Sequence, residues 1–152
     1  MAVLEKFRIV TTCNEVYDIT KMVKETVAKS GVKEGICIVH NMHSTAGLAV
    51  FSPWDPDGFA DLDDEIRRLV PTRIDFKHQH DTPQDAAGHI KSALLGVTLN
   101  FIVHEGALLI GGSQGLYFLE FDGPRNREFY VKVIADERWK KKDYFGLRPG
   151  YG

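Results

Sequence analysis

The sequence has few cysteines, almost no excess charge and no long apolar run, and each shortage excludes a class of protein. Cys13 and Cys37 are its only cysteines and form no C-x-x-C pair, which favours buried thiols in a reducing cytoplasm over a disulfide or a reactive thiol. The 19 Lys and Arg residues against 21 Asp and Glu residues leave a formal net charge of −2, so the whole surface does not attract nucleic acid or an acidic membrane. No run approaches the roughly 18–20 apolar residues of a membrane helix, and no secretory signal is visible at the start. We therefore expect a cytoplasmic protein with no membrane and no nucleic-acid partner.

The composition that is present is typical of one globular domain, because the 152 residues are 43% apolar and 26% charged. Helices are predicted at 20–29 with Thr20 as N-cap, at 55–71, and at 83–95 with Thr82 as N-cap three residues before Asp85. Apolar and β-branched runs predict strands at 3–12, 35–40, 47–51, 97–103, 107–110, 115–121 and 128–135. Because strands and helices do not alternate one for one, the pattern predicts an α+β fold with an antiparallel β-sandwich core and about three helices. We expect one domain at 1–137 and a basic C-terminal extension at 138–152.

Histidine is the most informative residue type, and the chain has six. His43 lies in a turn between two predicted strands, His78 and His80 lie in a polar loop, and His89 lies on the third predicted helix. Neutral imidazole is the commonest metal ligand, and three imidazoles with an open position are typical of catalytic zinc. The spacing of positions 43, 78 and 89 matches no short metal motif, so ordinary surface or core histidines are the alternative.

Two further segments carry residues suited to ligand binding. The turn at 122–127 places Arg125 and Arg127 two residues apart, which predicts an anion site, or else ion pairs with Glu120 or Glu128. The segment 111–115 has three glycines that would let its backbone approach a ligand, although a bulge or hairpin turn is the alternative. No G-x-S-x-G motif and no Cys–His neighbour supports a nucleophilic triad.

The motifs together carry a resemblance to a known family. They are, in chain order, His43-Ser-Thr-Ala46, Asp55-Pro56 with Asp61, Phe76-Lys77-His78, Gly88-His89-Ile90-Lys91-Ser92-Ala93-Leu94-Leu95-Gly96, Gly111 with Gln114-Gly115, and Glu120-Phe121-Asp122-Gly123-Pro124-Arg125. Their order and gaps resemble the YjbQ-like family over about residues 36–135.

The resemblance implies a compact α+β fold with a sandwich core, assembled as a homotrimer. It implies secondary thiamine-phosphate synthase activity, which joins a pyrimidine pyrophosphate to a thiazole phosphate and releases pyrophosphate. The partner would be a phosphorylated small molecule, and the cofactor a divalent metal, with Zn²⁺ expected and Mg²⁺ an ion that could arrive with the substrate. The resemblance assigns His43, His78 and His89 to the metal, His43, Asp61 and Arg125 to catalysis, and Asp85 and Arg125 to substrate. Lys91 and Gln114, in the matching motifs, are expected to act in catalysis and in substrate binding, and Asp61 or Asp85 is expected to orient a histidine.

The chain departs from the family pattern at two places. Ser52 and Pro53 stand where the pattern has Glu-Asn, and Gly112 and Ser113 stand where it has Thr-Trp. A carboxylate and an aromatic ring that could hold substrate or activate water are thereby lost, although His80 could compensate in part. Two hypotheses follow: a metal-dependent enzyme, or a non-catalytic trimeric protein that binds a metal or a ligand.

Overall fold

The computed structural model describes residues 2–137, so the predicted C-terminal extension at 138–152 lies outside the described residues. The elements in chain order are β1 (Ala2–Thr11), β2 (Val16–Asp18), α1 (Thr20–Ser30), β3 (Gly35–Asn41), β4 (Ala46–Phe51), α2 (Asp57–Leu69), α3 (Pro83–Leu95), β5 (Thr98–His104), β6 (Ala107–Leu108), β7 (Gly115–Glu120) and β8 (Arg125–Ala135). The residues between α2 and α3 form a long loop at 70–82.

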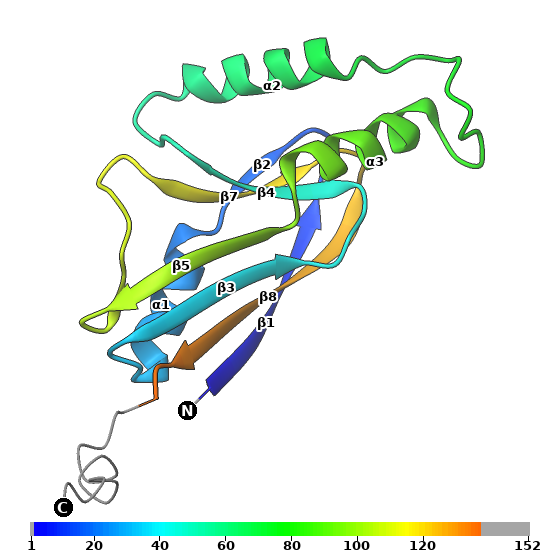
Figure 1. Ribbon diagram of the computed structural model, residues 1–152. Coiled ribbons are helices and arrows are strands. Elements are labelled where there is room, and N and C mark those ends of the chain that lie inside the picture. Colours follow the sequence, from blue (N-terminus) through cyan, green and yellow to red (C-terminus); the bar gives the residue numbers. More distant parts are fainter. Residues whose placement is uncertain (1, 138–152) are drawn as a thin grey trace, which may run out of the picture.

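Two antiparallel sheets form the core of the fold (Figure 1). One sheet has the strand order β1-β8-β3-β5-β6 and the other has the order β2-β7-β4. Buried side chains from both sheets and from α1 meet in one apolar cluster, which includes Val23 of α1, Val39 of β3 and Phe118 of β7. The predicted α+β fold with a sandwich core and three helices is therefore confirmed, and the sheets curl into a half-barrel.

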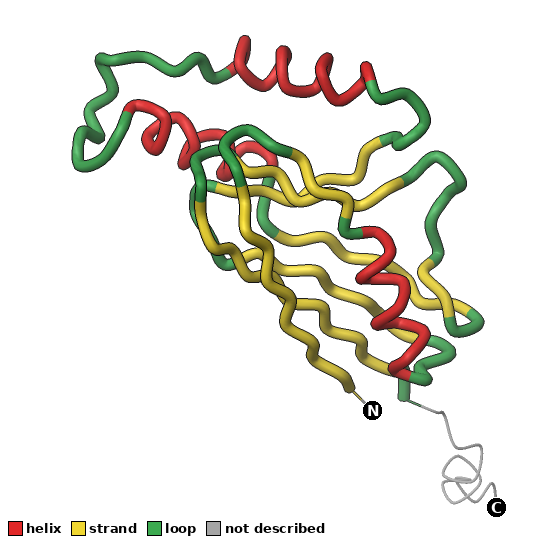
Figure 2. Tube along the Cα trace, turned by 180° about the vertical axis from the view of Figure 1, so that it is seen from behind, coloured by secondary structure: helices red, strands yellow, loops and turns green. Residues whose placement is uncertain are grey.

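The helix α1 closes one side of this core, as the view from behind shows (Figure 2). Its N-cap is Ile19 and not the predicted Thr20, because the Thr20 hydroxyl accepts a hydrogen bond from the backbone N–H of Leu116 at 2.9 Å. The carboxylate of Asp18 caps the helix instead, accepting from the Thr20 N–H at 2.9 Å. The helix ends at Gly31, which has the left-handed backbone conformation that favours glycine.

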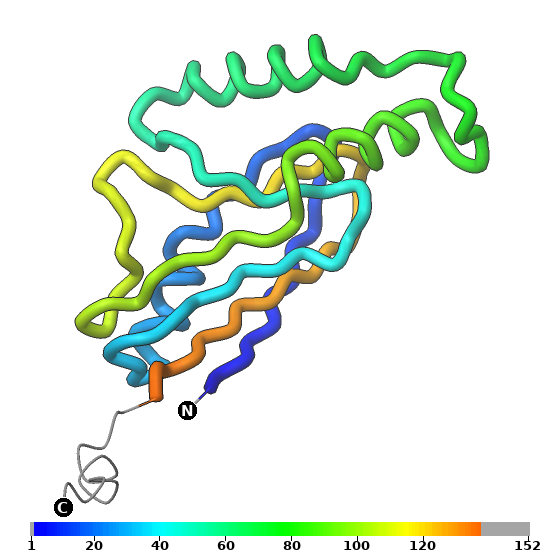
Figure 3. The backbone as a smooth tube through the Cα atoms, viewed as in Figure 1, coloured from blue at the N-terminus to red at the C-terminus, as the bar shows by residue number. Residues whose placement is uncertain are grey.

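The helices α2 and α3 lie on the outer side of the three-stranded sheet (Figure 3). All six residues of β7 are buried, since the core covers one face of this strand and the two helices cover the other. α3 packs closely on the sheet, and the Ser92 hydroxyl donates to the carbonyl oxygen of Ala46 at 2.7 Å. α2 packs more loosely, because Ile66 is its only buried residue.

The five-stranded sheet has one face that no helix covers within the described residues (Figure 1). Ile36 pairs directly with Ile134 on one neighbouring strand and with Ile102 on the other, so the three side chains form a row on this face. Their exposed fractions are 48%, 37% and 59%, respectively. Within residues 2–137, no helix is long and apolar enough to cross a membrane.

Candidate metal centre

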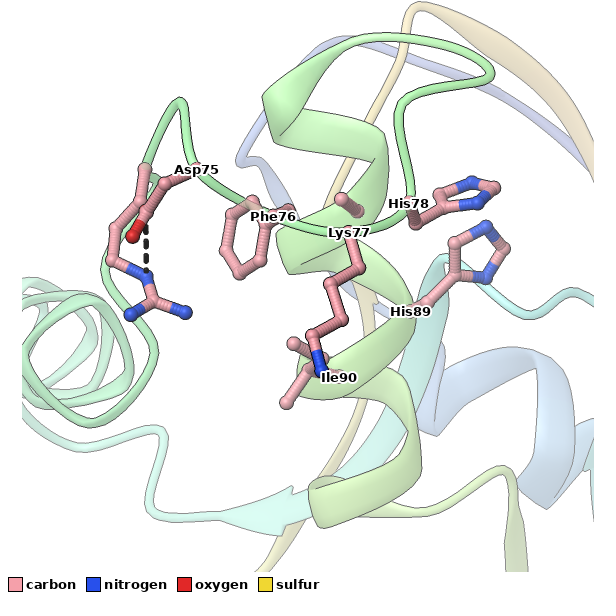
Figure 4. A pocket seen from close by; sticks show the side chains of 8 residues that line it. Asp75, Phe76, Lys77, His78, His89 and Ile90 are labelled. Atoms are coloured by element: carbon pink, nitrogen blue, oxygen red, sulfur yellow. Dashed lines mark ion pairs between the residues drawn. The ribbon is translucent and has the colours of Figure 1, made fainter.

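The start of α3 and the loop before it bring two imidazoles to one carboxylate. His78 Nε2 lies 3.1 Å, and His89 Nε2 lies 3.3 Å, from the same oxygen of Asp85, Oδ2. Asp85 and His89 lie one helical turn apart on α3, which puts them on the same helix face. The two imidazole rings lie edge to face with their centres 5.3 Å apart (Figure 4).

Local sequence fixes the position of Asp85. The predicted N-cap is confirmed, because the Thr82 hydroxyl accepts a hydrogen bond from the Asp85 backbone N–H at 3.1 Å and Pro83 opens the helix. Asp85 thus lies in the first turn of α3, where the positive end of the helix dipole favours a carboxylate. Its side chain is only 10% exposed, whereas the two histidines are close to half exposed.

The geometry of these three side chains suits a divalent metal ion. One ligand atom from each of His78, Asp85 and His89 lies within 4.8 Å of the others. A tetrahedral ion bound about 2.0–2.2 Å from each ligand atom holds those atoms about 3.3–3.6 Å apart, which is close to the two distances from Asp85 Oδ2. Two imidazoles with one carboxylate form a donor set found at catalytic zinc and non-haem iron sites. The exposed sides of both rings would leave positions open for water or a ligand oxygen.

A cavity of about 640 Å³ adjoins the two histidines. Phe76 and Ile90 supply apolar wall and Lys77 supplies positive charge (Figure 4). Arg73 also lines the cavity and adds a second positive charge. The Arg73 guanidinium lies 4.9 Å from the centre of the Phe76 ring, and its Nε lies 3.6 Å from a carboxylate oxygen of Asp75. A flat ring next to basic side chains and a candidate metal group is suited to a ligand that is both aromatic and anionic.

Arg125 lies beside the loop that carries His78. Its Nη2 lies 2.7 Å from Asp122 Oδ2 and 3.5 Å from Asp81 Oδ2. Hydrogen bonding and charge attraction from Asp122 raise the pKa of Arg125 above its usual value, with smaller contributions from Asp81 and Asp85. The guanidinium is about half exposed, so it is available to an anion that approaches this end of the molecule.

Arg127, the other arginine of the predicted anion turn, is not part of this surface. Its guanidinium is buried and pairs with the Glu120 carboxylate, with Nε to Oε2 at 2.7 Å. Its Nη2 also donates to the Thr45 hydroxyl at 2.8 Å. Of the two alternatives for Arg127, the structure therefore has the ion pair with Glu120.

The structure does not bring His43 into the group formed by His78, Asp85 and His89. The His43 Nε2 accepts a hydrogen bond from the backbone N–H of Glu128 at 2.9 Å, which occupies one of its two possible metal-binding nitrogens. Burial, and then the charge of Arg127, hold the pKa of His43 below its usual value. His43 and His89 do line a common cavity of about 450 Å³ on the other side of His89.

Three other predicted site residues, Asp61, Lys91 and Gln114, do not belong to the group of His78, Asp85 and His89. Asp61 is exposed on α2. Lys91 is buried with its ammonium 6.0 Å from the centre of the Phe121 ring, and burial followed by the charge of Arg67 lowers the pKa of Lys91. Gln114 precedes β7, whereas Asp122 follows it, and its side chain accepts a hydrogen bond from the Gly111 N–H at 2.8 Å.

From the sequence, Asp85 is expected to bind substrate or to orient a histidine, and its contacts with His78 and His89 agree with the second expectation. The sequence did not place it among the metal ligands. The signal that could have found it is the Asp-x-x-x-His spacing on a helix whose N-cap was already predicted, since residues four apart share a helix face. His80, which was considered as a compensating group, is exposed and does not belong to the three-residue group.

Comparison with known sequences gives the family. The model of the UPF0047, YjbQ-like protein family matches residues 5–136. The chain belongs to the YjbQ-like family. Relatives include a UPF0047 protein of Methanocaldococcus jannaschii, 38% identical over 135 residues that cover 88% of this chain and 96% of that protein. The UPF0047 protein YugU of Bacillus subtilis is 33% identical over 135 residues, covering 87% of this chain and 99% of that protein.

Solved structures of family members have the same fold. A YbjQ-like protein of unknown function from Sulfolobus solfataricus superimposes with a TM-score of 0.84 at 29% identity, covering 90% of this chain and 99% of that one. An uncharacterised YjbQ/UPF0047 protein from Clostridium acetobutylicum superimposes with a TM-score of 0.80 at 36% identity, covering 86% and 99% of the two chains. The resemblance drawn from the motifs is thereby confirmed at the level of family and fold.

Proposed function

We propose that this YjbQ-like protein is a metal-dependent enzyme of the secondary thiamine-phosphate synthase type, with its divalent ion held by His78, Asp85 and His89. The observation that carries the proposal is the single Asp85 oxygen that lies within 3.3 Å of both imidazole nitrogens. Zn²⁺ is the expected ion because imidazole and carboxylate oxygen both suit it, and Mg²⁺ could arrive with the pyrophosphate of the substrate.

The side chains around the centre have roles that follow from their chemistry. Phe76 and Ile90 would form an apolar wall beside the pyrimidine, while Arg73 and Lys77 at the same cavity would attract the phosphates. Arg125 would offset the charge that develops on pyrophosphate as its bond to the pyrimidine methylene carbon breaks and the thiazole nitrogen forms the new bond to that carbon. A bound divalent ion would add positive charge beside a phosphate oxygen. Lys91 has no part in this proposal, because its ammonium lies against Phe121.

Metal binding is tested by measuring zinc content and zinc affinity in matched variants. We expect His89→Ala and Asp85→Asn each to lower zinc affinity by at least about tenfold, as loss of a ligand or its partner does at zinc sites. His104→Ala is the matched control for His89→Ala, because His104 is also about half exposed and contacts the Glu34 carboxylate on another part of the surface. Equal zinc binding by all four proteins, wild type included, would contradict the proposed centre.

Activity is tested with a pyrimidine pyrophosphate and a thiazole phosphate, with formation of thiamine phosphate as the measurement. We expect product with zinc-loaded wild type, and a loss of at least about a hundredfold in Arg125→Ala, within the range found when one charge-stabilising donor is removed. Zinc binding by Arg125→Ala should be unchanged, which separates a lost substrate contact from a lost metal.

A second function, a non-catalytic protein that binds a metal or a ligand, is favoured by one specific observation. Asp122 and Asp81 already contact the Arg125 guanidinium, which reduces the charge it can offer to an anion. Ser52 and Ser113 also lack the carboxylate and the ring of the family pattern. Tight zinc binding without any thiamine phosphate formed, with or without Mg²⁺, would favour this second function.

We further propose that the protein is a cytoplasmic homotrimer. The exposed row of Ile36, Ile102 and Ile134 supports an assembly, because contiguous apolar patches on one sheet face are typical of contact surfaces. The number of three subunits comes from the family resemblance. Sedimentation of the purified chain measures it, and a mass of one subunit at micromolar concentration would contradict it.

A further inference from the structure

A second cavity lies beside the first half of α2 and has a different chemistry from the candidate metal centre. Its volume is about 560 Å³, within the range of small-molecule sites. It is formed by the turn before β2, by β2 and β7, and by the first half of α2. It shares no lining residue with the cavity beside His78 and His89.

The lining of this second cavity is acidic and aromatic. Glu15, Asp18 and Asp63 contribute three carboxylates, and no Lys, Arg or His lines it. Asp63 is paired with Arg67 at 2.7 Å, so the cavity keeps a net negative charge from the other two acids. Phe59 and Tyr117 form the aromatic part, edge to face with ring centres 4.9 Å apart.

The Tyr117 hydroxyl is the second, independent sign of a ligand. Tyr117 is 4% exposed, and none of the side-chain hydrogen bonds found among residues 2–137 involves its hydroxyl. Every fully buried polar side-chain atom of the described residues has a hydrogen-bond partner. The Tyr117 hydroxyl is therefore not fully buried and must be open to solvent. The open space that Tyr117 lines is this cavity. A ligand in this cavity could therefore pair with the Tyr117 hydroxyl.

The arrangement of the carboxylates does not suit a metal ion. Within residues 2–137, the ligand atoms of Glu15, Asp18 and Asp63 do not converge on one point as those of the metal centre do. Asp18 and Asp63 also have other partners, the Thr20 N–H and Arg67. Carboxylates spread around an aromatic wall are instead typical of sites for organic cations, which are attracted to ring faces and to diffuse negative charge.

We propose that the cavity between α2 and the three-stranded sheet binds a small organic ammonium ion. Its charged group would lie by Phe59 and Tyr117, with Glu15 and Asp18 supplying the opposite charge. The Tyr117 hydroxyl would accept a hydrogen bond from an N–H or O–H of the ligand. This site stands apart from the metal centre and does not depend on the function proposed for it.

The test uses choline as a cationic probe and dimethylbutanol, its uncharged carbon isostere, as the comparison. Both are titrated into the purified protein and followed by the amide signals of residues that line the cavity. We expect choline to shift the signals of Glu15 and Tyr117 in a saturable way, and to bind at least about tenfold more tightly than the isostere, since the attraction depends on charge. No saturable shift, or equal affinity for the two probes, would overturn the proposal.

Single substitutions at two lining residues locate the binding site, so the test does not depend on the folding of one variant. Glu15→Gln removes a charge, and Phe59→Leu removes a ring, so each should weaken choline binding by about fivefold or more. Glu25→Gln is the matched control, because Glu25 is exposed on α1 and does not line the cavity. Unchanged affinity in a folded Glu15→Gln protein, or an equal loss in Glu25→Gln, would contradict the site, as would displacement of choline by an equal concentration of Ca²⁺.

Discussion

The Glu120 carboxylate is enclosed by partners that stabilise its charge inside the core. The Thr11 hydroxyl donates to it at 2.6 Å and the Asp122 N–H donates at 3.0 Å, in addition to the Arg127 guanidinium. Burial opposes ionisation, but these donors and the Arg127 charge outweigh burial and lower the pKa of Glu120. The network also ties β7 to β1 and β8, directly below the turn that carries Arg125.

Removing that charge should be far more costly than removing a surface charge of the same type. Glu120→Gln would leave the buried Arg127 without an opposite charge, and we expect the free energy of unfolding to fall by about 3–5 kcal/mol. Glu128→Gln is the control, because Glu128 pairs with Arg8 at the surface, and we expect it to lose less than about 1 kcal/mol. Urea unfolding at pH 7 measures both, and equal losses would contradict the assigned role of the buried pair.

His43 should make the protein less stable as the pH falls. Because its pKa in the folded chain is below the usual value, the unfolded chain takes up a proton more readily at pH values under about 6.5. Once His43 is protonated, its Nε2 can no longer accept the hydrogen bond from the Glu128 N–H. In His43→Gln, measured with a chelator present, we expect the unfolding midpoint in urea to fall less between pH 7.5 and about 5 than it does in wild type.

His104 provides a control of opposite sign for this pH prediction. Its hydrogen bond to Glu34, and then the Glu34 charge, raise the pKa of His104. Its stabilising contribution is therefore present below the usual histidine pKa and is lost as the pH rises through the raised value. His104→Gln should differ from wild type most at low pH, in the opposite direction to His43→Gln. The same direction of change in the two variants would contradict these assignments.

At the scale of elements, α3 is the part that could be predicted best from the sequence. Thr82, Pro83 and Gly96 are local signals, and the helix at Pro83–Leu95 lies where they predicted it. The loop at 70–82 carries no periodic pattern, so the sequence could not show that it folds back to place His78 beside Asp85. The sequence likewise could not show that the Glu128 N–H pairs with His43 Nε2, because this contact depends on the register of β8 against β3.

α3 should also be sensitive to the size of Gly88, where the helix passes close to the turn after β7. A Cβ on Gly88 would lie 3.1 Å from the Phe121 carbonyl oxygen and 3.3 Å from Thr45 Cβ. In Gly88→Ala this crowding costs about 1–3 kcal/mol, against a gain of up to about 1 kcal/mol from helix propensity. We expect lower stability together with weaker zinc binding, because Asp85 and His89 would shift with the helix.

Gly58→Ala in α2 is the matched control for this substitution. A Cβ on Gly58 would meet only the Phe51 ring, at an ordinary contact distance of 3.4 Å. The helix-propensity gain should therefore remain, raising the free energy of unfolding by up to about 1 kcal/mol. Thermal unfolding and zinc titration compare the two variants, and a stabilised Gly88→Ala with wild-type zinc affinity would contradict the close packing of α3.

At the scale of the whole molecule, the uncovered face of the five-stranded sheet is the feature that the fold of a single chain explains least. The alternation along β3 predicts which residues face the core, and Cys37 and Val39 are buried as expected of one face of a strand. The same alternation puts Ile36 on the other face, where a solvated sheet would carry polar residues. The sequence of one chain does not say what covers this face. In the homotrimer proposed above, the covering surface would belong to another subunit.

Ile36 is the centre of that face and gives the sharpest test of assembly. Ile36→Lys would place a charge between Ile102 and Ile134, and burying an unpaired charge in an apolar contact is strongly unfavourable. We expect sedimentation to show subunits dissociating at concentrations where wild type stays assembled. Ile74→Lys is the control, because Ile74 is 90% exposed in the loop before α3 and lies away from this row. If both lysine variants keep the wild-type mass, the isoleucine row is not the contact between subunits, and assembly must use another surface.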